Sequence, residues 1–271
     1  MATLKAYRNG LTMGTPGGVV PPGGKRGRVE GWTAGSARRH TRWLYSVEVP
    51  YLTGYGWAVT LTVRDLPASA AEWHAARRAW IERVRRRGLV RLHWVVEWQR
   101  RGVPHLHAAV YVDDDGAGVG PALLVEWLEV CRRRGWTASI RSQDVKRIDG
   151  AVGWLQYLSK HAGRSAAHYQ RQGMPEGWTS SGRLWGHVGD WPVGTPVEAR
   201  LTGAEAVRLR RLIDQYQRAR ARAEGDRARE LYIRRRRRVE TDPYRSRVLG
   251  VSEWVPEHVT IRLLGLVGGE E

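Results

Sequence analysis

Apolar and polar residues alternate along short stretches of the chain, which is the pattern of strands with one buried face. Residues 57–64 (WAVTLTVR), 92–99 (LHWVVEWQ) and 105–112 (HLHAAVYV) carry this alternation, and a fourth strand is predicted over residues 136–141. The loop between the second and third strands contains Gly102, a residue that suits a hairpin turn. These two strands are therefore expected to pair antiparallel.

Two helices are predicted between these strands. Ser69 and Glu72 form a capping-box pattern, and the apolar helical face that follows ends before Gly88. Pro121 opens the second helix, whose apolar stripe ends at Gly135. The order strand, helix, strand, strand, helix, strand predicts an α+β fold with a ferredoxin-like (split β-α-β) antiparallel sheet and both helices on one face.

Strand alternation divides the residues of this sheet between two faces. The face beneath the helices is expected to hold the apolar set Trp57, Val59, Leu61, Leu92, Trp94, Val96, Trp98, Leu106, Ala108 and Val110. The opposite face would carry Thr60, Thr62, His93, Glu97, Gln99, His105 and His107. A third helix, predicted over residues 150–162, is expected to cross this polar face with Tyr157 and Lys160 on one side of it.

The chain outside this region predicts two extensions. Residues 10–31 are rich in glycine and proline, so residues 1–35 are expected to form a flexible basic arm before a catalytic domain at 36–188. A basic helix is plausible from about Ser36. Residues 189–271 are expected to hold a linker, an arginine-rich helix near 203–238 and a closing segment, which together make a helical C-terminal extension.

Charge narrows the class of partner. The chain has 45 Lys and Arg residues against 27 Asp and Glu, and its formal net charge of +18 favours a polyanion such as nucleic acid. Arginine supplies nearly all of this charge, which also indicates a GC-rich genome. The single Cys131 excludes a disulfide framework within one chain. Without an apolar run of membrane-spanning length or a signal peptide, no membrane association and a bacterial cytoplasmic location are expected.

His105 and His107 are candidate metal ligands, because residues two apart on a strand point the same way. A hairpin turning around Gly102 would place Gln99 opposite His105 and Glu97 opposite His107. Two imidazoles and one oxygen would suit Mg, Mn or another divalent ion acting as a Lewis acid, with Glu97 or Gln99 as the third ligand. The alternative is two ordinary surface histidines on an exposed strand, which the polar face and Glu97 argue against.

The other histidines carry weaker signals. His93 shares the polar face and is expected to support the ligands or to face solvent. His161, beyond Tyr157, is ambiguous between a structural and a DNA-contacting role. The remaining ones have no partner pattern and are expected to be ordinary: His40, His74, His168, His187 and His258.

Tyr157 is a candidate nucleophile. A phenol with a pKa near 10 attacks a phosphodiester poorly unless the phosphate becomes more electrophilic or the phenol more acidic. A metal on the sheet face would do the first, and Lys160 would hold the phosphate or help to position the phenolate. The alternatives are a core-packed tyrosine and a solvated lysine.

Three motifs in order resemble those of the HUH endonucleases, specifically the rolling-circle replication initiators of bacterial plasmids and filamentous phages. They are residues 57–62 (WAVTLT), 104–107 (PHLH) and 157–160 (YLSK), and Glu97 with the following turn and residues 182–186 (GRLWG) also look like features of those proteins. The resemblance covers residues 36–220.

This resemblance implies a site-specific nickase that acts on a single-stranded or hairpin origin. A divalent metal on His105 and His107, with Glu97 as a third ligand, would polarise the phosphate. Tyr157, helped by Lys160, would attack it and leave a 5′-phosphotyrosine and a free 3′-OH. A host helicase and polymerase would then extend that end, and position 161, a histidine, implies one nucleophilic tyrosine.

Two other functions remain open from the sequence. A non-catalytic nucleic-acid-binding protein can use the same strand order, but it stacks bases on aromatic residues of the open sheet face. A relaxase or single-strand transposase would use the same chemistry on another substrate. Relaxases usually place the tyrosine before the histidines, and here it follows them.

Overall fold

The chain divides into two compact units in the computed structural model, which describes residues 1–14, 28–116, 118–150, 153–154, 157, 166–240 and 251–268. The central unit comprises Gly24–Leu44 and Glu48–Pro192. The terminal unit comprises Met1–Gly23, Tyr45–Val47 and Val193–Glu271. The N-terminal residues thus group with the C-terminal ones, whereas we expected two separate extensions.

The central unit is built on a five-stranded antiparallel sheet with the strand order β6-β3-β5-β4-β7. The strands are β3 (Tyr55–Thr62), β4 (Leu89–Trp98), β5 (Pro104–Val112), β6 (Asp144–Ile148) and β7 (Trp185–Gly189). The predicted α+β class is confirmed. The ferredoxin-like arrangement stays an interpretation, since β7 adds a fifth strand beside β4.

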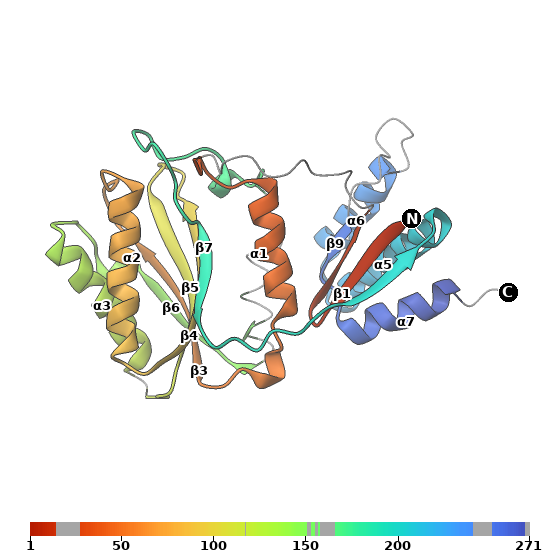
Figure 1. The fold of residues 1–271 in the computed structure, drawn as a ribbon, viewed down its shortest axis with the longest axis horizontal. Coiled ribbons are helices and arrows are strands. Elements are labelled where there is room, and N and C mark those ends of the chain that lie inside the picture. The colour runs from red at the N-terminus through yellow and green to blue at the C-terminus, as the bar shows by residue number, and fades with distance from the viewer. Residues whose placement is uncertain are drawn as a thin grey trace. The chain divides into compact units, whose positions relative to one another are not determined.

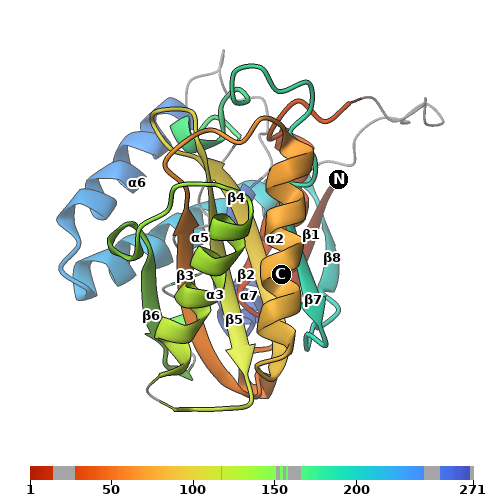
Figure 2. The ribbon, with the colours of Figure 1, turned by 90° about the vertical axis from the view of Figure 1, so that its left-hand side faces the viewer.

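Helices α2 (Ala70–Arg85) and α3 (Val119–Arg133) cover one face of this sheet (Figures 1 and 2). The Ser69 hydroxyl caps α2 by accepting a hydrogen bond from the Glu72 amide, as the capping-box pattern predicts. The apolar strand residues assigned to this face form one buried core with the helix residues, including Trp73, Trp80 and Trp127. Burial of this apolar surface is the main force that holds the helices on the sheet.

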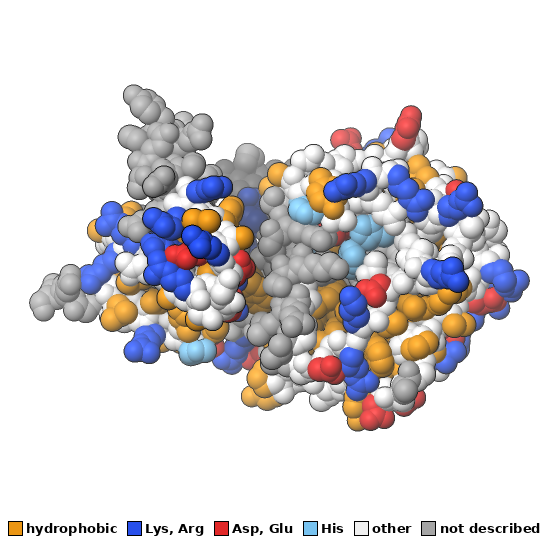
Figure 3. All heavy atoms as spheres, turned by 180° about the vertical axis from the view of Figure 1, so that it is seen from behind, with side chains coloured by type: hydrophobic (Ala, Val, Ile, Leu, Met, Phe, Trp, Pro, Cys, Tyr) orange, Lys and Arg blue, Asp and Glu red, His pale blue; other side chains and the backbone are white. Residues whose placement is uncertain are grey.

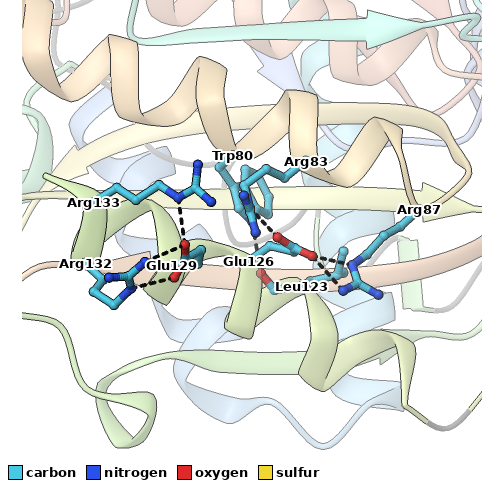
Figure 4. A network of polar contacts seen from close by, with 8 residues as sticks. All are labelled: Trp80, Arg83, Arg87, Leu123, Glu126, Glu129, Arg132 and Arg133. Atoms are coloured by element: carbon cyan, nitrogen blue, oxygen red, sulfur yellow. Dashed lines mark hydrogen bonds and ion pairs between the residues drawn. The ribbon is translucent and has the colours of Figure 1, made fainter.

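A polar network joins the two helices at the edge of that core (Figure 4). The Trp80 indole donates to the Leu123 carbonyl at 3.0 Å. Glu126 of α3 accepts hydrogen bonds from Arg83 and Arg87, which belong to α2 and the turn after it. The network therefore fixes the register of α2 against α3.

The fourth strand lies three residues later than the sequence predicts. Residues 136–139 have no regular structure, and a 3-10 turn, η2 (Ile140–Ser142), precedes β6. Ser139 causes this turn, because its hydroxyl accepts from the Arg141 amide and its carbonyl accepts from the Ser142 hydroxyl at 2.7 Å. The strand prediction over 136–141 was therefore wrong.

Helix α1 (Ala34–Ser46), together with Trp154 and Tyr157, contacts the polar face of the sheet through ring packing on His93 and Tyr111. Gly153, Trp154 and Tyr157 are helical, as the predicted third helix requires, while the rest of residues 151–162 lies outside the described part. The sequence predicted a helix near α1 but not that it would cover this face.

The terminal unit has its own sheet, with the strand order β8-β1-β2-β9 and a separate apolar core. Its strands are β1 (Ala2–Tyr7), β2 (Gly10–Gly14), β8 (Val197–Leu201) and β9 (Val251–Glu253), and its helices are α5 (Gly203–Ala223), α6 (Arg227–Glu240) and α7 (Glu257–Gly268). Among the described helices, none has the length and apolar character needed to cross a membrane.

Two expectations fail in this unit. Residues 2–14, expected within the flexible arm, form a hairpin because Leu4, Leu11 and Met13 alternate into the core; the Gly- and Pro-rich residues 15–27 lie outside the described part. The arginine-rich helix is divided into α5 and α6. Gly225, at a φ of +70°, takes the left-handed conformation that ends α5.

Candidate active site

Glu97, His105 and His107 form a buried cluster on the polar face of the central sheet. One potential ligand atom from each lies within 4.8 Å of the others. Glu97 of β4 is directly opposite His105 of β5, and Val95 is opposite His107. The expected pairing of Glu97 with His107 was wrong, because the hairpin is centred one residue earlier than Gly102, yet Glu97 still reaches both histidines.

The two imidazoles point at one another. His105 Nε2 and His107 Nε2 are 2.7 Å apart, and the Thr60 hydroxyl lies 3.0 Å from His107 Nδ1. Thr60 is opposite His107 in the β3–β5 register, so this contact follows from strand pairing. A partner on Nδ1 orients the ring and leaves Nε2 directed into the cluster. Two imidazole nitrogens and a carboxylate oxygen in one buried cluster are a donor set that fits a divalent metal.

Arg171 fixes the carboxylate of this cluster. Its Nε donates to Glu97 Oε1 at 2.8 Å, and both side chains are fully buried. Glu97 Oε2 lies 3.7 Å from His107 Nε2. The guanidinium carbon also lies 4.1 Å from the centre of the Trp32 ring. We did not identify Arg171 from the sequence, where it is one arginine among many.

Gln99, the alternative third ligand, lies in a different hydrogen-bonding environment. Its amide nitrogen donates to the Thr62 hydroxyl, and its oxygen accepts from Arg101 Nε at 2.7 Å. Between the two candidates, Glu97 is the one that joins the histidines.

Tyr157 lies on the same sheet face, with its hydroxyl 3.1 Å from His93 Nδ1. Its ring stacks on Trp154 at 5.6 Å and is buried. Burial, with smaller contributions from Glu97 and Tyr111, raises the pKa of this phenol well above its ordinary value. Lys160 and His161 lie outside the described residues, so the proposed role of Lys160 stays a prediction.

His93 and His40 add a second buried polar group, whose Nε2 atoms are 3.0 Å apart. His93 faces neither solvent nor the metal cluster; it lies between His40 and Tyr157. Burial is the main cause that lowers the pKa of both histidines well below the ordinary value. His40, expected to be ordinary, is thus part of the site, and no local pattern marks it because its partner is 53 residues away.

Basic side chains surround the site and the rest of the chain. Arginine and lysine are spread over the visible surface of both parts in Figure 3, where histidine side chains are also visible. This distribution agrees with the formal net charge of +18 and with an anionic partner.

Comparisons with known proteins agree with this arrangement. Residues 56–162 match the model of the replication-associated protein family named after the phage ORF2 product. The chain is 43% identical to the replication-associated protein of Pseudomonas phage Pf3, over 97% of this chain and 96% of that protein. It is also 43% identical to a putative replication protein of Xylella fastidiosa (strain 9a5c), over 99% and 97% of the two chains, and 44% identical to one of strain Temecula1, over 94% and 99%.

No solved structure matches the chain. The similarity to the phage and Xylella proteins extends over almost the whole of each sequence and includes both units. The chain therefore belongs to the ORF2-type family of replication-associated proteins.

Proposed function

We propose that the chain starts rolling-circle replication by nicking a single-stranded or hairpin origin through a metal-dependent attack of Tyr157. The observation that carries this proposal is the placement of Tyr157 on the sheet face that also holds Glu97, His105 and His107. Family membership supports a role in DNA replication over a relaxase or transposase, because the relatives are named replication proteins.

The residues divide the chemistry between them. His105, His107 and Glu97 would hold a Mg or Mn ion, which supplies Lewis-acid polarisation of the scissile phosphate. Arg171 keeps the Glu97 carboxylate oriented, and Thr60 orients His107.

Tyr157 is the nucleophile in this proposal. Its oxygen forms a bond to phosphorus as the P–O3′ bond breaks, which leaves a 5′-phosphotyrosine and a free 3′-OH for a host polymerase, with a host helicase opening the duplex. Lys160 is proposed to hold the phosphate.

Incubation of the full chain with Mn and labelled single-stranded oligonucleotides, tiled across the replicon that encodes it, tests the proposal. We expect a covalent adduct on a denaturing gel that is lost in Tyr157→Phe and on chelation. Tyr169→Phe is the matched control, because Tyr169 is 55% exposed and packs on His168 and Arg100. An adduct that persists in Tyr157→Phe would refute the assigned nucleophile.

A further inference from the structure

A hydrogen-bonded chain runs from the Tyr157 hydroxyl through His93 to His40. Tyr157 Oη lies 3.1 Å from His93 Nδ1, and His93 Nε2 lies 3.0 Å from His40 Nε2. His93 belongs to β4 and His40 to α1, so two elements far apart in sequence meet behind the proposed nucleophile. Neither histidine belongs to the metal-type cluster.

Aromatic rings hold this chain in place. The His93 ring stacks on His40, with centroids 5.1 Å apart and planes within 10°, and on Trp43 at 4.8 Å. Trp185 packs on His40 at 5.0 Å. Both imidazoles are fully buried, so their orientation is set by packing rather than by solvent.

Protonation of the chain follows from burial. The pKa of both His93 and His40 is lowered by desolvation, so both rings are neutral at neutral pH, and a neutral imidazole has one donor and one acceptor nitrogen. His93 can therefore accept from the phenol through Nδ1 while it donates to His40 through Nε2. Other titratable or charged groups near this pair are His187 of β7, which faces His93, and Arg171, which faces His40.

We propose that His93 accepts the Tyr157 proton during the attack on phosphorus, and that His40 is the positioning residue that holds His93 in its accepting tautomer. This inference rests on the proposed nicking function. The Oη–P bond forms, the P–O3′ bond breaks, the phenol proton moves to His93 Nδ1, and the 3′ oxygen takes a proton from water. Rejoining reverses these steps, and His93 returns its proton to the tyrosine.

The buried phenol makes such an acceptor necessary. Its raised pKa keeps Tyr157 protonated at neutral pH, so the proton must leave as the new bond forms. The phenolic oxygen loses electron density to phosphorus at that moment, and its proton becomes acidic enough for a neutral imidazole to accept it. General-base assistance of this kind contributes about 10²- to 10⁴-fold to a rate.

The test is the single-turnover rate of adduct formation with Mn and a cleaved oligonucleotide, measured from about pH 6 to 9. We expect the wild-type rate to be nearly flat over this range. His93→Gln should be about 100-fold slower at pH 7, and its rate should rise about tenfold per pH unit, because the phenol must then ionise on its own. His40→Gln should be slowed less than His93→Gln.

His187→Gln is the matched control, because His187 also stacks on Trp43, at 4.6 Å, and no hydrogen bond to Tyr157 is found for it among the described residues. It should keep the wild-type rate within about twofold and the same pH profile, since it carries no part of the proton transfer. A His93→Gln profile parallel to that of His187→Gln would overturn the inference.

A second readout separates proton transfer from a purely structural role. A fluorinated tyrosine of lowered pKa at position 157 should restore much of the rate of His93→Gln, whereas a packing defect would not respond to it. If His93→Gln does not fold, the same comparison is made in His40→Gln. An adduct that no longer depends on Tyr157 would overturn the nicking proposal itself; a Tyr157-dependent adduct without these His93 effects would overturn only this inference.

Discussion

Arg171 and Glu97 form an ion pair with both side chains fully removed from solvent, at an Nε–Oε1 distance of 2.8 Å. Removal of one partner of such a pair leaves a buried charge without its counter-charge, which costs about 3–5 kcal/mol. We therefore expect Arg171→Met to lower the free energy of unfolding of the metal-free protein by about that amount, as measured by urea titration.

A double variant identifies the cause of this loss. Glu97→Leu combined with Arg171→Met removes both charges, so its loss should be clearly smaller than that of Arg171→Met alone. Arg100→Met is the matched control, because Arg100 is exposed and lies over the Tyr169 ring. A loss below about 1 kcal/mol in Arg171→Met, a cost typical of surface pairs, would contradict the prediction.

Thr60 should set the metal affinity through His107. Its hydroxyl lies 3.0 Å from His107 Nδ1, and loss of a partner on a ligand histidine typically weakens metal binding about 10- to 100-fold. We expect Thr60→Val to show this loss in calorimetric titration with Mn, with little change in secondary structure. Thr12→Val, on β2 of the other sheet, should bind as the wild type does. Equal affinities in the two variants would show that the Thr60 hydroxyl does not orient the ligand.

The sequence could predict what depends on local periodicity. Alternation along β3, β4 and β5 assigned Thr60, His105 and His107 to one face, and the register confirms that they are neighbours. The error in the Glu97 pairing was a shift of the turn, which alternation does not detect because the same residues stay on the same face.

Contacts between distant segments could not be predicted in this way. Arg171 is 74 residues from Glu97, and His40 is 53 residues from His93. Strand β1 pairs with β8 across most of the chain, which is why residues 2–14 were placed in a flexible arm. Such pairings are decided by tertiary packing, and a single sequence carries no local mark of them.

His74 should make the central unit sensitive to acid. Its Nε2 lies 2.8 Å from the Ser181 carbonyl, and burial lowers its pKa from 6.5 to about 4. Because the folded pKa is below the unfolded one, protonation favours unfolding. The stabilisation is fully present above about pH 6.5 and is lost as the pH falls to about 4, by up to about 3 kcal/mol.

Urea unfolding at several pH values between 4.5 and 7.5 measures this effect. His74→Gln should be less stable than wild type at pH 7.5 but should lose less stability on acidification. His258→Gln is the control, since His258 is exposed on α7. An unchanged acid dependence in His74→Gln would show that other groups, such as the buried His40 and His93, carry the whole effect.

The exposed Arg234 and Arg235 of α6 are expected to contact the DNA backbone rather than the reacting phosphate. Each phosphate contact with single-stranded DNA contributes about 0.7 to the slope of log affinity against log salt concentration. Arg234→Gln with Arg235→Gln should therefore reduce that slope by about 1.4 in fluorescence-anisotropy titrations, while the rate of adduct formation at saturating DNA stays unchanged. Arg78→Gln with Arg86→Gln, which removes two exposed charges from α2 and its C-terminal end, gives the matched control. If both pairs change the slope equally, binding follows net charge alone; if only the α6 pair does, the terminal unit tracks the strand.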